Sequence, residues 1–151
     1  MKIRLANKFD SEKICEMLKH FRSQTPISEL EHCNDKDYIL KLLQQMFVGG
    51  GVIYVAEKED QLVGMIMGII SHSIWDQNLL MLREMAFWVE PEHRGSTAGH
   101  RLISAYTKYA KELVSQNRIK VYTMTKMVTS PDLSFDKFGY KKTEEVWVAG
   151  A

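Results

Sequence analysis

The sequence predicts an α/β (α+β) fold, in which one domain holds a mixed, mostly antiparallel central sheet flanked by helices. The chain has 151 residues, of which 45% are hydrophobic and 26% charged, as expected for one globular domain. Short strand-like and longer helix-like patterns alternate, without repeats or low-complexity tracts. We therefore expect a single domain over residues 1–151, with the element order βααβββαβαβ.

The first third of the chain predicts one strand and two helices. Residues 2–6 open the sheet, and Asp10 and Ser11 are good helix caps ahead of an apolar stripe. That stripe, which recurs every three or four residues, consists of Ile14, Met17, Leu18 and Phe21. Residues 23–37 contain Pro26 and four acidic side chains and predict a loop. The stripe of the second helix is Ile39, Leu42, Leu43, Met46 and Phe47, and three glycines at 49–51 end it.

The middle of the chain predicts an antiparallel meander of three strands. They cover residues 52–57, 62–71 and 79–90, with turns at 59–60 and 76–78. The run from 63 to 70 is almost continuously apolar, which predicts a central strand buried on both faces.

The last third predicts alternating helices and strands. A long helix covers residues 98–114, and a strand follows at 119–124. Residues 131–138 predict a short helix that Gly139 ends, and residues 141–148 predict a final strand.

Charge and composition limit the classes of partner. Twenty basic against nineteen acidic residues give a net charge of +1, which supplies no broad field for nucleic acid or an anionic membrane. The first residues turn polar too early for a signal peptide, no apolar run could span a bilayer, and only Cys15 and Cys33 could form a disulfide. We expect a cytoplasmic protein. The five histidines are scattered without ligand spacing, so we expect no metal site.

The strongest local signal for chemistry lies at residues 94–99, between a strand and the long helix. Arg94, Gly95, Ser96, Thr97, Ala98 and Gly99 stand there. The first turn of a helix exposes unpaired N–H groups and a partial positive charge, so a phosphate or pyrophosphate fits there. Arg94 adds charge, and Gly95 and Gly99 permit close approach of the backbone. An ordinary strand-to-helix turn with a surface arginine is the alternative.

At these residues the sequence resembles the GNAT (Gcn5-related N-acetyltransferase) family. Its pyrophosphate motif, Gln/Arg-x-x-Gly-x-Gly/Ala, is similar to residues 94–99, and its C-terminal Tyr-x-x-x-Gly-Phe segment is similar to residues 135–140. The Arg94-Gly95-Ser96 turn is also similar to turns in acetyltransferase-like proteins of bacteriophages. The resemblance implies acetyl-CoA as cosubstrate. It also implies that Phe87, Trp88 and Val89 bind the pantetheine arm and the developing oxyanion. From its place at the helix start His100 can approach the bound anion, and a surface histidine is the alternative.

Two positions depart from the family pattern. Thr97 stands where the family has its first motif glycine, which places a Cβ near the pyrophosphate. Phe135 stands where many members carry a tyrosine that protonates the departing thiolate, and phenylalanine has no proton to donate. Tyr140, Ser134 and Tyr122 remain as alternative donors.

The resemblance further implies direct attack of a primary amine on the thioester, assisted by a base. Glu84, on the strand that leads to the motif, is the candidate, and the alternative is a carboxylate paired with Arg83 or another cation. Glu90 is the weaker candidate, because it follows the strand and is expected to be solvated. The acceptor, a small-molecule or protein amine, is expected to contact loops 23–37, 73–78 and 127–133.

Two other functions stay open at this stage. One is a noncatalytic acyl-CoA-binding or partner-binding module on the same scaffold, and the other is an unrelated nucleotide-binding domain. The missing Gly-x-x-x-x-Gly-Lys-Ser/Thr loop speaks against the latter. A homodimer through a sheet edge or the final strand is possible, since the family contains such dimers, but no residue pattern decides it.

Overall fold

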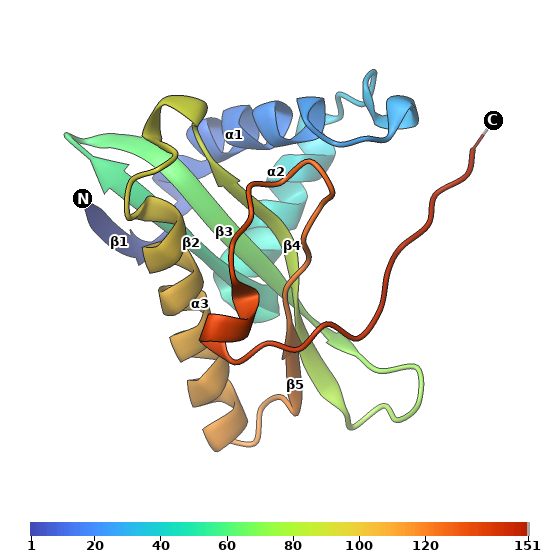
Figure 1. Cartoon of the computed structure of the whole chain (residues 1–151). Coiled ribbons are helices and arrows are strands. Elements are labelled where there is room, and N and C mark those ends of the chain that lie inside the picture. Colours follow the sequence, from blue (N-terminus) through green and yellow to red (C-terminus); the bar gives the residue numbers. More distant parts are fainter. Residues whose placement is uncertain (151) are drawn as a thin grey trace.

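The computed structural model describes residues 1–150 and has a five-stranded sheet at its centre (Figure 1). The strand order follows the chain, β1-β2-β3-β4-β5. The strands are β1 (Lys2–Leu5), β2 (Gly51–Lys58), β3 (Gln61–His72), β4 (Leu80–Val89) and β5 (Val121–Thr123). The first four pair antiparallel, and β5 pairs parallel to β4. The predicted fold class, a mixed and mostly antiparallel sheet flanked by helices, is confirmed.

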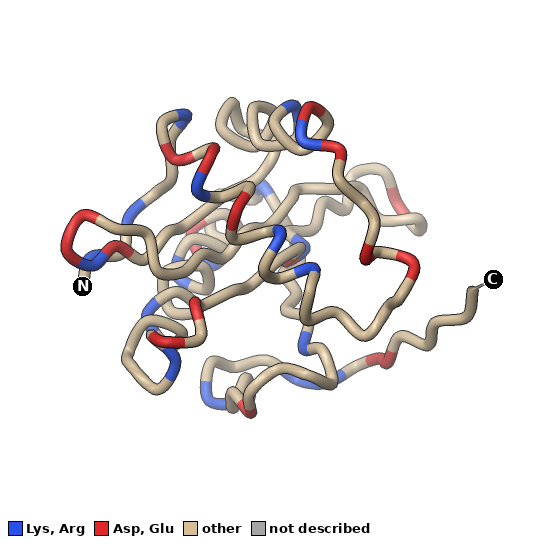
Figure 2. The backbone as a smooth tube through the Cα atoms, turned by 90° about the horizontal axis from the view of Figure 1, so that it is seen from above, with Lys and Arg blue, Asp and Glu red and all other residues tan. Residues whose placement is uncertain are grey.

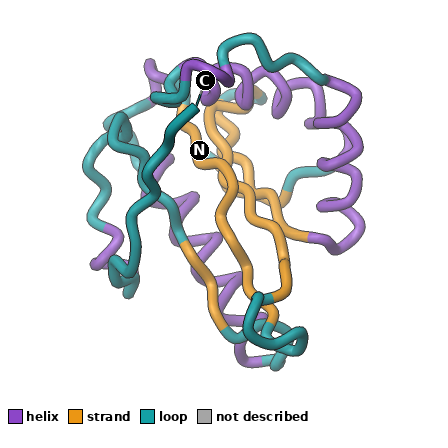
Figure 3. The backbone as a smooth tube through the Cα atoms, turned by 90° about the vertical axis from the view of Figure 1, so that its right-hand side faces the viewer, coloured by secondary structure: helices purple, strands orange, loops and turns teal. Residues whose placement is uncertain are grey.

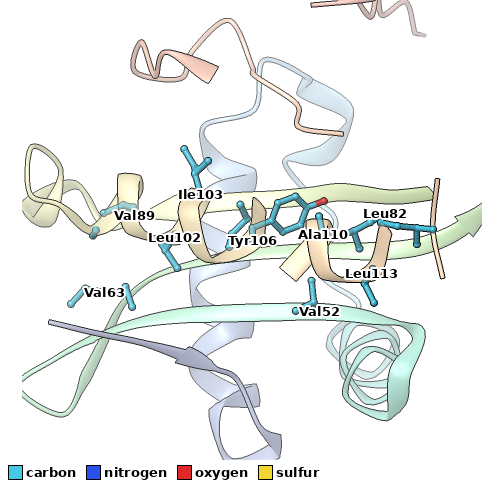
Figure 4. Close-up of a cluster of buried hydrophobic side chains, with 13 residues drawn as sticks. Val52, Val63, Leu82, Val89, Leu102, Ile103, Tyr106, Ala110 and Leu113 are labelled. Carbon is cyan, nitrogen blue, oxygen red and sulfur yellow. The ribbon is translucent and has the colours of Figure 1, made fainter. Parts of the chain in front are cut away.

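Helices cover both faces of the sheet (Figures 1 and 3). On one face, α1 (Ser11–Ser23) and α2 (Lys36–Gln45) bury Ile14, Met17 and Leu43 against the strands. On the other face lies α3 (Ala98–Ser115), whose inward side chains interlock with the sheet (Figure 4). These side chains are Leu102, Ile103, Tyr106, Ala110 and Leu113. The sheet therefore lies between two hydrophobic cores, one on each face.

The central strand β3 is buried on both faces, as its continuous apolar run predicts. Val63 and Ile66 belong to the core under α3, whereas Met65 and Met67 belong to the core under α1 and α2. Gly68 lies where the ring of Tyr106 crosses the strand, because a Cβ there would lie 2.8 Å from that ring. This close approach requires glycine.

Most element boundaries agree with the sequence prediction to within two or three residues. The turn between β2 and β3 has Glu59 and Asp60 at φ 52° and 61°, the left-handed pair of a tight hairpin. The predicted second helix ends in a single wide turn at Met46–Gly50. The predicted strand at 119–124 is shorter, since only Val121–Thr123 pairs with β4.

The C-terminal region differs from the prediction in two ways. The expected helix at 131–138 is reduced to one 3-10 turn, Phe135–Phe138, which Gly139 ends. The expected strand at 141–148 is wrong, because this segment is unpaired and runs away from the sheet (Figure 1). Five of its eight residues are polar, and the three-residue β5 offers a short edge to pair with. Val146 and Trp147 are consequently 88% and 87% exposed.

The element order of the described residues is therefore βααβββαβ, followed by a 3-10 turn and an extended tail. Among residues 1–150, no helix has both the length and the apolar character needed to cross a membrane.

Candidate active site

A cavity of about 410 Å³ opens at the end of the sheet where β4 leads into α3. Its walls come from four segments: the end of α1, the second half of β4, the turn before α3 and the loop that follows β5. Nine of the residues expected to serve catalysis or cosubstrate binding line it, namely Glu84, Phe87, Trp88, Val89, Arg94, Gly95, Ser96, Gly99 and His100. The structure thus brings the predicted site together around one cavity.

The sheet splays at this cavity. Pairing between β4 and β5 is limited to Met81–Arg83 of β4, and residues 84–89 have no partner on the β5 side among the described residues. The opposite edge of β4 remains paired to β3 as far as Val89. An open strand edge of this kind can bind an extended amide-containing chain by β-type hydrogen bonds.

The turn before α3 presents a set of free backbone donors. Among residues 1–150, the N–H groups of Gly95, Thr97, Gly99 and His100 have no hydrogen-bond acceptor. They stand at the positive end of an 18-residue helix. Gly95 has φ +83°, a conformation that favours glycine, and so allows the chain to enter the helix at this angle. The turn is chemically suited to an anion such as a pyrophosphate.

Arg94 is held against the end of β4. Its Nε donates to the carbonyl oxygen of Val89 at 2.9 Å, and its guanidinium lies 4.5 Å from the ring centre of Trp88. The two terminal guanidinium nitrogens make no hydrogen bond within residues 1–150. Arg94 therefore both anchors the turn and keeps donors available beside the free N–H groups.

A β-bulge sets the direction of Glu84. Met67 pairs with Ala86 while the next residue of β3, Gly68, pairs with Glu84, so Met85 is an extra residue in β4. Because the bulge breaks the alternation of faces, Ala86 packs in the core under α1 and α2 while Glu84 faces Tyr106 and Thr125. Glu84 thereby reaches the cavity from the α3 side of the sheet.

Glu84 is a buried carboxyl group with a single backbone donor. It is 7% exposed, and its Oε2 accepts a hydrogen bond of 3.0 Å from the amide of Thr125. Burial raises the pKa of Glu84 to about 7, and the bonds from Thr125 oppose that rise without cancelling it. No ion pair to Arg83 or to another cation forms within residues 1–150. The alternative expectation, that Glu84 is paired with Arg83 or another cation, is therefore wrong as far as the pairing is concerned.

Two residues of the predicted cosubstrate motif do not line the cavity. The Ala98 side chain is fully buried under α3, and Thr97 is exposed at the helix N-cap without a side-chain capping bond. Thr97 contributes its free N–H rather than its hydroxyl. His100 packs on Phe138 at 4.8 Å between ring centres and remains exposed.

The three alternative proton donors also lie outside the cavity lining. Tyr140 shares a hydrogen bond of 2.8 Å with the hydroxyl of Thr107, and burial raises its pKa to about 12. Tyr122 packs edge-on against Tyr140, and Ser134 precedes the 3-10 turn. Phe135 lines the cavity, so a ring stands there with no hydroxyl group.

The expectation of a solvated Glu90 is wrong. Glu90 is 7% exposed, and its two oxygens lie 3.0 and 3.1 Å from Nδ1 of His20 on α1. The pair ties α1 to the end of β4, directly behind the ring of Trp88, which lies 6.4 Å from the His20 ring. Glu90 is not among the residues lining the cavity.

Sequence reasoning missed several residues of the site. Phe21 at the end of α1 and Thr125 after β5 line the cavity, and Thr125 is the hydrogen-bond partner of Glu84. Of the expected acceptor loops, Gln24 and most of 127–133 contribute, whereas 73–78 does not. Residue spacing does not indicate Thr125 as a site residue. Its position just after β5, the strand parallel to β4, does indicate that it lies beside Glu84. Among residues 1–150, no cluster of three His, Cys, Asp or Glu side chains suited to a metal is present.

The open edge of β4, the free N–H groups at the start of α3 and the buried carboxyl of Glu84 meet at one cavity, an arrangement suited to acyl transfer from a substrate with an anionic group. The model of the acetyltransferase (GNAT) family matches residues 14–133, which is most of the chain. The chain belongs to this acetyltransferase family, as the sequence resemblance predicts. No curated protein matches the chain.

Solved structures share the fold at low sequence identity. A protein described as a predicted acetyltransferase, with acetyl-CoA, from Clostridium acetobutylicum superposes with a TM-score of 0.75 at 13% identity, over 99% of this chain and 95% of that one. An aminoglycoside acetyltransferase from an uncultured soil metagenomic sample gives 0.70 at 15%, over 98% and 95%. A ribosomal-protein-alanine N-acetyltransferase from Brucella melitensis gives 0.65 at 14%, over 99% of both chains.

Proposed function

We propose that this protein uses acetyl-CoA to acetylate a primary amine by direct attack on the thioester, with Glu84 as the general base. The observation that carries the proposal is the position of Glu84. Its buried carboxyl, with a pKa of about 7, lines the same cavity as the open edge of β4 and the anion-binding turn. The related structure with acetyl-CoA supports the choice of cosubstrate.

Each part of the cavity then has a role in holding acetyl-CoA. The free N–H groups of the turn and the terminal nitrogens of Arg94 bind the pyrophosphate. The unpaired edge of β4 at Phe87, Trp88 and Val89 binds the amides of the pantetheine arm. The same edge places a backbone N–H near the thioester oxygen, where negative charge develops.

Glu84 supplies the proton acceptor. An alkylammonium has a pKa near ~10.4 and is mostly protonated at neutral pH, so its nitrogen must lose a proton to attack. A carboxylate with a pKa of about 7 takes that proton more readily than one at its ordinary 4.5. The neutral nitrogen bonds to the carbonyl carbon, the carbon–sulfur bond breaks, and the nitrogen releases its second proton to solvent to become the amide. The departing thiolate takes up a proton from solvent. A thiol pKa near ~8.5 makes this departure feasible without a tyrosine at position 135.

The second candidate is a noncatalytic acyl-CoA-binding module, and Phe135 favours it. No tyrosine is among the residues lining the cavity, so a hydroxyl donor typical of many family members is absent from its wall. Under this alternative the cosubstrate binds and no amine is acetylated. Binding and transfer must therefore be measured separately.

Calorimetry with acetyl-CoA tests the shared first step. We expect micromolar binding by the wild type and a loss of at least tenfold in Arg94→Glu, because a carboxylate then faces the pyrophosphate. Arg118→Glu carries the same charge change on the exposed loop after α3 and should bind like the wild type. Acetylation of an amine panel, followed by mass spectrometry, separates the enzyme from the module. No binding by the wild type would reject both.

A further inference from the structure

The charges around the acceptor end of the cavity select a class of amine, given the proposed function. This end is formed by residues outside the cosubstrate half: Phe21, Gln24, Met85, Thr125, and the loop from Lys126 to Leu133. Only Glu84 and Asp132 are acidic among all the lining residues. Asp132 is paired with Lys126, whose Nζ lies 2.5 Å from its Oδ1. One uncompensated carboxyl therefore remains, and it is the proposed base.

The acidic loop 23–37 does not supply more negative charge to the cavity. Its acidic side chains, Glu29, Glu31, Asp35 and Asp37, are all exposed, and none is among the lining residues. Elsewhere, acidic and basic positions are spread over the whole backbone (Figure 2). The acidic side chains of loop 23–37 therefore add no negative charge to the cavity.

The rest of the acceptor wall is apolar or uncharged. Phe21, Met85, Met127 and Leu133 present hydrophobic surface to the cavity, and Met85 is 53% exposed at the bulge. The hydroxyl of Thr129 donates to the carbonyl oxygen of Gln24 at 3.0 Å, which joins the end of α1 to the loop after β5. The acceptor end thus has a mixed wall of apolar and polar side chains, and a hydrogen bond closes it.

We infer that the acceptor is a monoamine, rather than a polycation such as a polyamine or an aminoglycoside. A single ammonium is matched by Glu84. A second ammonium held inside the cavity would lose water and find only Asp132, which is already paired with Lys126. This inference separates the chain from the aminoglycoside acetyltransferase of the same fold.

A matched pair of amines tests the inference: hexylamine and 1,6-diaminohexane, which differ by one terminal amine. Spermidine and sisomicin extend the series, and kcat/KM is measured for each with saturating acetyl-CoA. We expect hexylamine to exceed the diamine by at least tenfold. A diamine, spermidine or sisomicin that matches or exceeds hexylamine would overturn the inference.

A charge variant provides the second readout. Lys126→Met leaves Asp132 without its cation, and both side chains are exposed enough for the fold to tolerate the change. We expect the ratio of kcat/KM for the diamine to that for hexylamine to rise about fivefold. The double variant Lys126→Met with Asp132→Asn removes both charges and should restore the wild-type ratio; an unchanged ratio in Lys126→Met would contradict the inference.

Failure of the proposed function can be distinguished from failure of the inferred acceptor class. Loss of acetyl-CoA binding in the wild type would overturn both proposals. Binding without transfer to any amine of the panel would overturn the acceptor class and leave the cosubstrate site in place.

Discussion

The amide nitrogen of Thr125 lies 3.0 Å from Oε2 of Glu84, although 41 residues separate them along the chain. The contact joins β4, at its bulge, to the first residues after β5. The contact gives Oε2 of the buried carboxyl one hydrogen-bond donor in a fixed position, and the residue lines the cavity. A base held in this way keeps its position while its environment raises its pKa.

Turnover should depend on Glu84 much more than cosubstrate binding does. Glu84→Gln keeps the shape of the side chain and cannot take a proton, so we expect kcat to fall about 10²-fold or more. The affinity for acetyl-CoA in calorimetry should change less than threefold. Glu59→Gln, in the turn after β2, removes an exposed carboxyl and should leave both quantities unchanged. Equal rates in wild type and Glu84→Gln would remove Glu84 from the mechanism.

The rate of transfer should rise with pH through the ionisation of Glu84. Below its pKa of about 7 the carboxyl is protonated and cannot act as a base, so kcat/KM should increase tenfold per pH unit there and level off above it. This rise of kcat/KM with pH should be absent in Glu84→Gln. A wild-type profile that is flat from pH 5.5 to 8 would be inconsistent with this role.

The stability of the fold should carry the opposite pH dependence. The pKa of Glu84 is higher in the folded chain, about 7, than its ordinary 4.5, so between these values the folded state holds more protons. Stability therefore falls as pH rises from 4.5 to 7 and is constant above that range, as far as Glu84 contributes. Glu84→Gln should gain roughly 1–3 kcal/mol relative to wild type between pH 4.5 and pH 8. Urea unfolding at several pH values measures this gain, and parallel curves would refute it.

Two neighbouring glycines should respond oppositely to alanine. Gly95→Ala forces a Cβ into φ +83° and should cost about 1 kcal/mol of folding free energy, although no atom lies within 4 Å of that Cβ. Gly99→Ala lies in α3, where its Cβ would meet the Phe87 ring at an ordinary 3.5 Å, and should gain about 0.5 kcal/mol. Urea midpoints at neutral pH measure both. The same sign for both variants would argue against the turn conformation.

Residue patterns predicted the parts of this protein that local physics determines. The apolar run of β3, the stripe of α3 and the turn at Glu59 and Asp60 each follow from periodicity or turn chemistry. The free donors at Gly95 and Thr97 follow from the general properties of a helix start.

Contacts between segments that lie far apart in the sequence could not be predicted from residue patterns. The His20–Glu90 pair and the Thr125–Glu84 bond depend on how α1 and β5 are placed beside β4, which no local pattern specifies. The prediction of a final strand at 141–148 is wrong for a related reason. A strand requires a partner edge as well as suitable residues, and β5 provides only three paired residues.

The most direct measurement of the central claim is the titration of the Glu84 side-chain carboxyl by carbon-13 NMR, with Glu84→Gln used to assign its signal. The measurement needs neither acceptor nor cosubstrate. A midpoint near 7 is predicted, because burial raises the pKa of this group. A midpoint near the ordinary 4.5 would contradict the account, since a solvated carboxylate would then stand where a buried base is required.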